Sequence, residues 1–226
     1  MATQLDLQEQ EQLDALKAFW KQYGNLITWL LVIVLGGFAG WNFWQKLQRD
    51  KAQEANALYT LFDEAARAGD VEKTTRVFND LKERFPRTAF AEQAALQAAK
   101  VQFDKGQADA AKAALTWAAD NAVEDEYRTV ARLRLAGLLI DAKQYDEALK
   151  QLDGAKAPGF EALVADRRGD ALAASGKKDA ARTAYQEAYK AMDEKFEYRR
   201  LVEAKLTALG ATAEAAASAA ASGASK

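Results

Sequence analysis

Three stretches of the chain align without gaps, and this internal repeat restricts the possible folds more than any other feature. They are residues 104–111, 141–148 and 174–181, and a looser copy occupies residues 68–74. When their last residues are aligned, successive copies are 37, 37 and 33 residues apart. A period of this length is typical of a helical solenoid, in which each helix pair buries its apolar face against its neighbours.

Each copy carries the residues that a helix pair needs at fixed places. Gly69, Gly106 and Gly176 stand where a first helix must end, because glycine accepts the left-handed conformation that closes a helix. A carboxylate follows near the start of the next helix, where free amide groups and the helix dipole favour negative charge. These carboxylates belong to Asp70, Asp109, Asp146 and Asp179.

Residue size also repeats, in a way similar to the tetratricopeptide pattern. A small residue allows the two helices to pack closely, and a larger residue follows four positions later. Further small residues lie twelve positions before and seven positions after the first small residue. These positions are Ala111, Ala148 and Ala181; Leu115, Leu152 and Tyr185; Ala99, Ala136 and Gly169; and Ala118, Ala155 and Ala188. The first copy departs from the pattern with Thr74 and Phe62, as a terminal repeat often does.

The sequence therefore predicts an all-α fold. Sustained alternation of β-branched residues is absent, and the only two prolines, Pro86 and Pro158, fall in predicted turns. We expect a tetratricopeptide-like right-handed helical solenoid of about four helix pairs plus a capping helix. The expected helices span residues 52–68, 71–84, 89–105, 108–120, 127–142, 145–153, 160–175, 178–192 and 197–208.

A single transmembrane helix is predicted ahead of the repeats. No charged residue occurs between Lys21 and Lys46, a window of 24 residues with aromatic side chains near both ends. A hydrocarbon core of roughly 30 Å needs about 20 apolar residues in a helix. A cleaved secretory signal is the alternative, with small residues at 37 and 39, but the leading segment is acidic and the apolar run is longer than that of a typical signal.

These observations divide the chain into four parts. Residues 1–21 form an acidic N-terminal tail that is partly helical, residues 22–45 the transmembrane helix, residues 46–209 the repeat domain, and residues 210–226 a disordered Ala/Ser-rich tail. Gly36 and Gly40 form a G-x-x-x-G pair that would let another helix approach closely. The alternative is that glycine is simply frequent in membrane helices.

Composition excludes several classes of function. The chain has no cysteine and no histidine, which excludes Cys-His and Ser-His-Asp nucleophiles, thiolate or imidazole metal sites, and disulfides. Residues 46–209 carry 28 basic and 28 acidic residues, so nothing indicates nucleic-acid binding. Carboxylate pairs such as Glu124 with Glu126, or Asp166 with Asp170, are interpreted as solvated charge on polar helix faces. We expect no catalytic residue, cofactor, metal or small-molecule substrate.

Taken together, the acidic tail, the aromatic-flanked span and the short repeat domain resemble the YfgM-like family of bacterial inner-membrane proteins. The resemblance is carried by residues 16–24 (LKAFWKQYG), 40–44 (GWNFW) and 85–91 (FPRTAFA). It implies an ancillary subunit of the SecYEG translocon that works beside a membrane-anchored periplasmic chaperone, with a link to envelope stress signalling.

The resemblance also implies an orientation in the bilayer of the inner membrane, with the N-terminus cytoplasmic and the repeat domain periplasmic. Flanking charge does not decide it, because Lys17 and Lys21 precede the span while Lys46, Arg49 and Lys51 follow it. Large domains can be translocated regardless of such a small bias. The periplasmic placement is therefore an expectation from the family resemblance.

The first helix of each pair in such a solenoid lines a concave surface that binds extended peptides or a partner's helix. The repeat phase places five apolar residues toward that side, although core packing is the alternative for each. They are Tyr59, Leu96, Phe103, Leu133 and Ile140. We therefore predict a non-enzymatic, membrane-anchored adaptor that binds proteins, and the alternative is a regulatory or self-associating scaffold.

Overall fold

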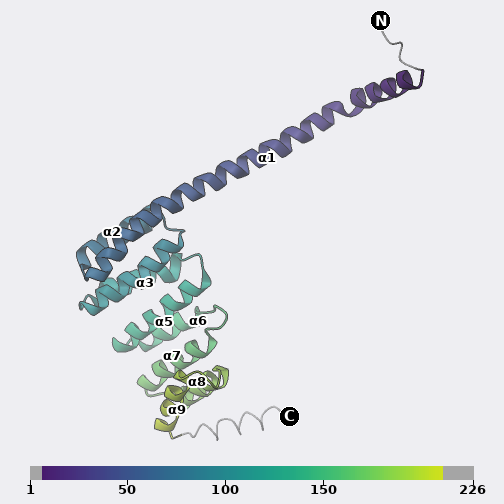
Figure 1. The fold of residues 1–226 in the computed structure, drawn as a ribbon. Coiled ribbons are helices and arrows are strands. Elements are labelled where there is room, and N and C mark those ends of the chain that lie inside the picture. The colour runs from purple at the N-terminus through teal and green to yellow at the C-terminus, as the bar shows by residue number, and fades with distance from the viewer. Residues whose placement is uncertain (1–6, 211–226) are drawn as a thin grey trace, which may run out of the picture. The chain divides into compact units, whose positions relative to one another are not determined.

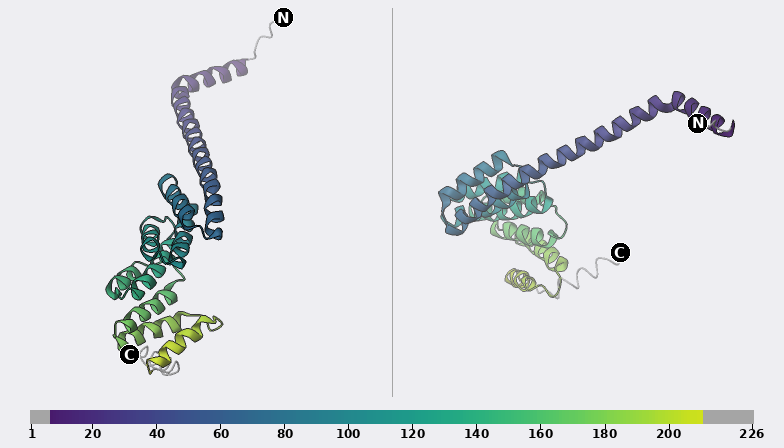
Figure 2. Two further views of the ribbon diagram at one scale, coloured as in Figure 1. Left: turned by 90° about the vertical axis from the view of Figure 1, so that its left-hand side faces the viewer. Right: turned by 45° about the horizontal axis from the view of Figure 1, so that its top comes forward.

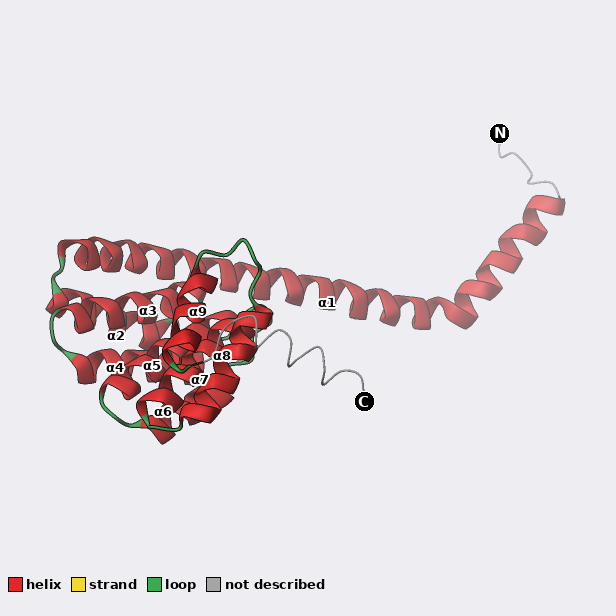
Figure 3. Ribbon diagram, turned by 90° about the horizontal axis from the view of Figure 1, so that it is seen from below, coloured by secondary structure: helices red, strands yellow, loops and turns green. Residues whose placement is uncertain are grey.

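The computed structural model describes residues 7–210, and in these residues every regular element is a helix (Figures 1 and 3). The predicted disordered tail lies outside the described residues except for Gly210, as do residues 1–6 of the predicted acidic tail. The all-α prediction is confirmed. The helices are α1 (Leu7–Ala68), α2 (Val71–Arg84), α3 (Ala89–Asp104), α4 (Ala108–Asn121), α5 (Asp125–Asp141), α6 (Tyr145–Asp153), α7 (Glu161–Ala174), α8 (Lys178–Ala191) and α9 (Tyr198–Ala208).

The helix α1 is longer than the sequence predicts, whereas α2 to α9 begin and end within two residues of the predicted bounds. The segment predicted as a separate helix at 52–68 is the last part of α1. Residues 46–51 (KLQRDK) contain neither glycine nor proline, and most of them are good helix formers, so nothing ends the helix there.

The chain divides into two compact units between Gln53 and Glu54. The first unit contains the N-terminal part of α1, and α1 is the one helix among the described residues that is long and apolar enough to cross a membrane. None of the side chains in its apolar window is buried within the protein. This is the exposure that a helix surrounded by lipid requires.

The second unit is built from helices that pack against their sequence neighbours. From α2 to α9 each helix contacts the next one, and the first helices of successive pairs also meet, α3 with α5 and α5 with α7 (Figures 1 and 2). The last turns of α1 join this stack, because Asp63 accepts a hydrogen bond from Gln97 of α3 at 3.3 Å. Contacts between neighbouring repeats are the defining feature of a solenoid.

The turns within the helix pairs have the predicted conformation. Gly69, Gly106 and Gly176 have φ angles of 67°, 77° and 82°. Lys143 occupies the same place in the third copy and is the only non-glycine residue with positive φ among the described residues, at 59°. The Asp70 side chain caps α2 by accepting from the Lys73 amide at 3.0 Å.

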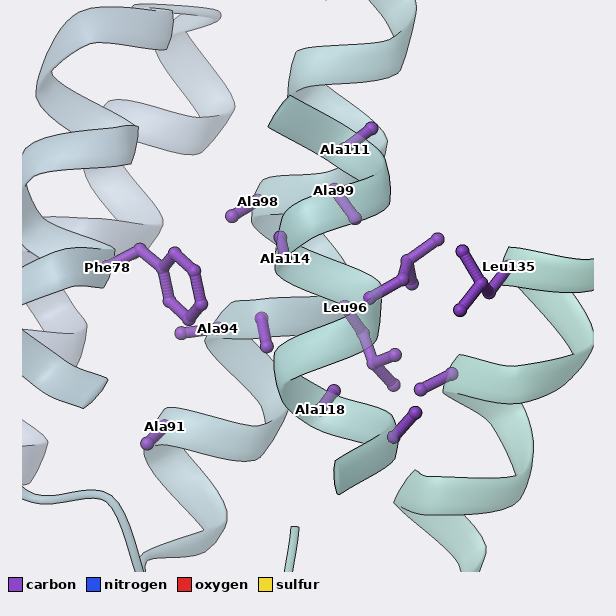
Figure 4. Close-up of a cluster of buried hydrophobic side chains, with 14 of the residues drawn as sticks. Phe78, Ala91, Ala94, Leu96, Ala98, Ala99, Ala111, Ala114, Ala118 and Leu135 are labelled. Carbon is purple, nitrogen blue, oxygen red and sulfur yellow. The ribbon is translucent and has the colours of Figure 1, made fainter. Parts of the chain in front are cut away.

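Alanine dominates the core, and this allows the helices to pack closely. The small positions of the repeat, Ala99, Ala111, Ala118 and Ala136 among them, are almost fully buried. In Figure 4 the Phe78 ring reaches from α2 toward alanines of α3, and Leu96 lies on the side of α3 that faces α5. A second cluster, formed mainly by α8 and α9, contains Tyr185, Met192, Val202 and Leu206.

Candidate protein-binding groove

A groove of about 400 Å³ is lined by the first helices of three successive pairs, α3, α5 and α7. Its apolar lining comes mainly from Phe103 of α3, Leu115 of α4, and Leu133 and Leu138 of α5. Gly137 leaves the α5 backbone without a side chain in the middle of this lining. A concave apolar surface of this size can take one or more large side chains of a bound molecule.

Two of the five predicted groove residues line this groove. Phe103 and Leu133 project into it from equivalent faces of α3 and α5. The Phe103 side chain is 48% exposed, which is unusual for a phenylalanine on a packed helix, whereas Leu133 is half-buried. Phe103 is therefore the largest apolar side chain that the groove offers to a partner.

The other three predicted residues pack within the domain. The Tyr59 ring lies 5.7 Å from the Phe62 ring and 5.5 Å from the Phe90 ring, and its hydroxyl donates to Gln97 at 3.4 Å. Burial, followed by the charge of Asp63, raises the pKa of Tyr59 above its usual value. Leu96 is 9% exposed and belongs to the core, and Ile140 is half-buried against the same core.

Charged side chains form the rim of the groove. Arg134 of α5 donates to the Leu96 carbonyl at 3.1 Å. The Arg167 guanidinium lies over the bare backbone of Gly137, since a Cβ placed there would be 3.7 Å from its terminal nitrogen. Asp141 follows Gly137 by one helical turn and is exposed. The apolar floor is thus bounded by cations and a carboxylate.

The sequence prediction did not include the rim. Lys100, Arg134, Asp141 and Arg167 line the groove together with the predicted apolar residues. One signal was present, because Arg134 and Arg167 are 33 residues apart, the same step as the last repeat. Apolar periodicity alone could not select them, since charged residues recur on every exposed helix face.

The carboxylate pair in α7 corrects one interpretation of the sequence. Asp166 and Asp170 were interpreted as solvated, but Asp166 is 2% exposed. Lys205 of α9 contacts both carboxylates, at 2.8 Å and 2.7 Å. The Tyr198 hydroxyl donates to Asp166 at 2.8 Å, and the Tyr185 hydroxyl donates to Asp170 at 2.8 Å. The pair is therefore part of a buried network that holds α9 against α7.

This network changes the acidity of the two phenols. The pKa of Tyr198 is raised to about 12, mainly by burial. The hydrogen bond to Asp166 and the charge of that carboxylate raise it further. Burial and the nearby Asp170 also raise the pKa of Tyr185.

The other predicted carboxylate pair, Glu124 and Glu126, is exposed. Within residues 7–210 no group of acidic side chains is arranged to hold a metal ion.

The two glycines predicted to pack against another helix lie in the apolar part of α1. Apart from the adjoining residues and backbone of α1 itself, no atom of the described residues lies within 4 Å of a Cβ built on Gly36 or Gly40. This face of α1 is therefore open. It meets the steric condition for close approach of a second helix.

The similarity to known proteins extends over both the apolar helix α1 and the repeats. A family model described as a tetratricopeptide repeat-like domain matches residues 17–211. A protein of Neisseria gonorrhoeae named "Ancillary SecYEG translocon subunit" is 31% identical over 204 residues, which cover 90% of this chain and 98% of that protein. The chain belongs to the ancillary SecYEG translocon subunit family.

Other members of the family are similarly distant. The Escherichia coli K12 protein of the same name is 30% identical over 79% of this chain and 85% of its own length. The Haemophilus influenzae protein is 30% identical over 80% of this chain and 89% of its own length. The resemblance drawn from residues 16–24, 40–44 and 85–91 is confirmed, and the family match begins within the first of these segments.

Proposed function

We propose that this chain is a non-enzymatic, membrane-anchored adaptor at the SecYEG translocon. In this proposal α1 anchors the chain in the bilayer, and the groove around Phe103 and Leu133 binds polypeptide partners. The observation that carries the proposal is the similarity to proteins named as ancillary translocon subunits, which extends over the apolar helix and the repeats alike. Helical-repeat domains use such surfaces to bind peptides or helices.

The proposed partners are the SecYEG translocon and a membrane-anchored periplasmic chaperone. The names of the relatives support the first partner. The resemblance to the YfgM-like family supports the second. A groove tethered near the membrane would meet polypeptides at a high local concentration as they leave a translocon, which suits a weak and open binding surface.

Affinity purification of the tagged full-length chain from membranes, followed by mass spectrometry, tests this function. We expect SecYEG subunits and a membrane-anchored periplasmic chaperone among the co-purified proteins. A tagged single-span protein with an unrelated soluble domain is the control for proteins that adhere to any membrane anchor. If translocon subunits are no more abundant with this chain than with the control, the proposal is wrong.

The proposal places the N-terminus in the cytoplasm and the repeat domain in the periplasm of the bacterial inner membrane. Protease added to intact spheroplasts should then digest residues 46–210, and a cytoplasmic marker protein should survive in the same sample. Protection of the repeat domain until the membrane is lysed would show the opposite orientation.

A self-associating or regulatory scaffold in envelope stress signalling is the second candidate function. The open face at Gly36 and Gly40 favours it, because two copies of α1 could approach closely there. The native mass of the detergent-extracted chain separates the two functions. A dimer that is lost in the Gly36→Ile and Gly40→Ile double variant supports the scaffold, whereas a monomer supports the adaptor.

A further inference from the structure

The groove has a charge polarity along α5. Arg134 precedes Gly137 by about one turn, and Asp141 follows it by about one turn, so that the two side chains start about 10 Å apart along the helix axis. All three residues line the groove. One end of the groove is therefore cationic and the other acidic, with the apolar floor between them.

The charges at the two ends are available to a partner. Neither Arg134 nor Asp141 forms an ion pair with another residue in the described part of the chain. Lys100, by contrast, is neutralised by Asp104 of its own helix. Arg167 is 3.5 Å from Asp170, and Asp170 is shared with Lys205 at 2.7 Å. Lys205 and Arg167 together balance Asp166 and Asp170, so Arg134 is the lining cation that has no carboxylate partner in the described part of the chain.

This polarity is local. Residues 46–209 carry equal numbers of basic and acidic residues, so the repeat domain as a whole favours neither sign of charge. A partner that follows the groove meets first one sign and then the other. Charges at the rim of an interface contribute to specificity and register more than to affinity, and complementary placement selects among partners with similar apolar anchors.

We infer that the groove takes a polypeptide segment of a partner protein in which a large apolar side chain lies between an acidic and a basic residue. The apolar side chain would occupy the floor beside Phe103 and Leu138. The acidic residue would lie at Arg134, and the basic residue at Asp141. This inference rests on the proposed function, since it specifies what the protein-binding groove recognises.

The chain's own C-terminal tail does not fit this description. Residues 211–226 contain Glu214 and Lys226, but the residues between them are alanine, serine and glycine. No large apolar side chain is available to fill the floor. The tail is therefore not the occupant that we infer, and the order of the two charges sets the direction of a bound segment along α5.

Three labelled peptides with the same Leu-Phe-Leu centre provide the test. One has a glutamate before and a lysine after the centre, the second has glutamate on both sides, and the third has lysine on both sides. Fluorescence anisotropy measures their binding to the full-length chain in nanodiscs of zwitterionic lipid, with empty nanodiscs as the blank. We expect the mixed-charge peptide to bind about two- to fivefold more tightly than either of the others.

Variants of the rim make the test sharper. Arg134→Glu makes both ends acidic and should switch the preference to the lysine peptide, whereas Asp141→Lys should switch it to the glutamate peptide. Lys150→Glu, an exposed change on α6 outside the groove lining, is the matched control and should leave the preference unchanged. Both rim residues are exposed, so we expect each variant to fold, and far-UV circular dichroism checks this.

The outcomes also separate this inference from the proposed function. Equal binding of the three peptides, unchanged by the rim variants, would overturn the charge polarity. Failure of all three to bind would overturn it too. Co-purification of translocon subunits with the native chain would still support the proposed function in both cases, and its absence would count against that function independently of the peptide results.

Discussion

The Lys205 ammonium lies 2.8 Å and 2.9 Å from the two carboxylate oxygens of Asp166, and this contact joins α9 to α7. Asp166 is almost completely buried, so its charge depends on partners for stabilisation. Lys205 is also 2.7 Å from Asp170. A single lysine therefore bridges two carboxylates at the C-terminal end of the solenoid, and Arg167 supplies a second positive charge 3.5 Å from Asp170.

Removing this lysine should destabilise the repeat domain strongly. Lys205→Met leaves the Asp166 carboxylate buried without its cation, and breaking a buried pair in this way costs about 3–5 kcal/mol. Lys150→Met is the matched control, because Lys150 pairs with Glu147 at an exposed site, where solvent screening leaves such a pair little effect on stability. Urea unfolding followed by far-UV circular dichroism measures both variants. Equal losses of stability would contradict the importance of the network.

Alkaline pH should weaken the same region through Tyr198. Its pKa is about 12 in the folded chain and about 10 in an unfolded chain. The unfolded state therefore loses its proton first, so the stability from the neutral phenol is complete below pH 10 and is lost as the pH rises from 10 to 12. Tyr198→Phe should unfold with a weaker pH dependence in this window. An unchanged dependence would show that Tyr198 does not couple to folding.

The contact between Tyr185 and Gly169 should tolerate no added methyl group. A Cβ on Gly169 would be 2.4 Å from two carbons of the Tyr185 ring, and relieving such overpacking costs about 1–3 kcal/mol. Gly137→Ala is the control, since a Cβ there meets Arg167 at an ordinary 3.7 Å and alanine favours a helix. We expect Gly169→Ala to lower the thermal midpoint and Gly137→Ala to keep or raise it. The reverse order would refute the packing described for α7 and α8.

Lys143 should be a site where glycine stabilises the fold. Its φ of 59° costs a residue with a Cβ about 1–2 kcal/mol, a cost that Gly69, Gly106 and Gly176 avoid in the equivalent turns. Lys143→Gly should therefore raise the free energy of unfolding by about 0.5–1 kcal/mol. Gly106→Ala should lower it by a similar amount, because open space surrounds Gly106 and only the backbone conformation opposes a side chain. Urea titration of both variants checks the two signs.

Much of the fold could be predicted because the repeat carries the same information several times. The glycines at 69, 106 and 176 set the turns, and the small residues at 111, 148 and 181 set the close packing between helices. The unbroken course of α1 could not be predicted as readily. At residue 46 the sequence changes from apolar to charged, and this change is interpreted as the end of the membrane-spanning helix. Residues 46–51 contain no helix-ending signal, however, and polarity alone does not end a helix.

The groove could be predicted only in part, and the buried network between α7 and α9 could not be predicted, for two physical reasons. Tyr59 and Leu96 have the correct helical phase, but side chains of neighbouring helices cover them, and coverage depends on tertiary packing. Asp166 and Lys205 are 39 residues apart and meet only when α9 folds back onto α7. Their burial could not be deduced from the polar pattern of either helix.

The most direct test of partner binding at the groove compares two substitutions of equally exposed apolar residues. Phe103 and Leu201 are each 48% exposed, but only Phe103 lines the groove, and Leu201 lies on α9. Full-length chains carrying Phe103→Asp or Leu201→Asp are purified from membranes, and the co-purifying proteins are quantified by mass spectrometry. We expect the Phe103→Asp chain to lose polypeptide partners that the Leu201→Asp chain retains. Retention of the same partners in the same amounts by both variants would contradict the proposed role of the groove.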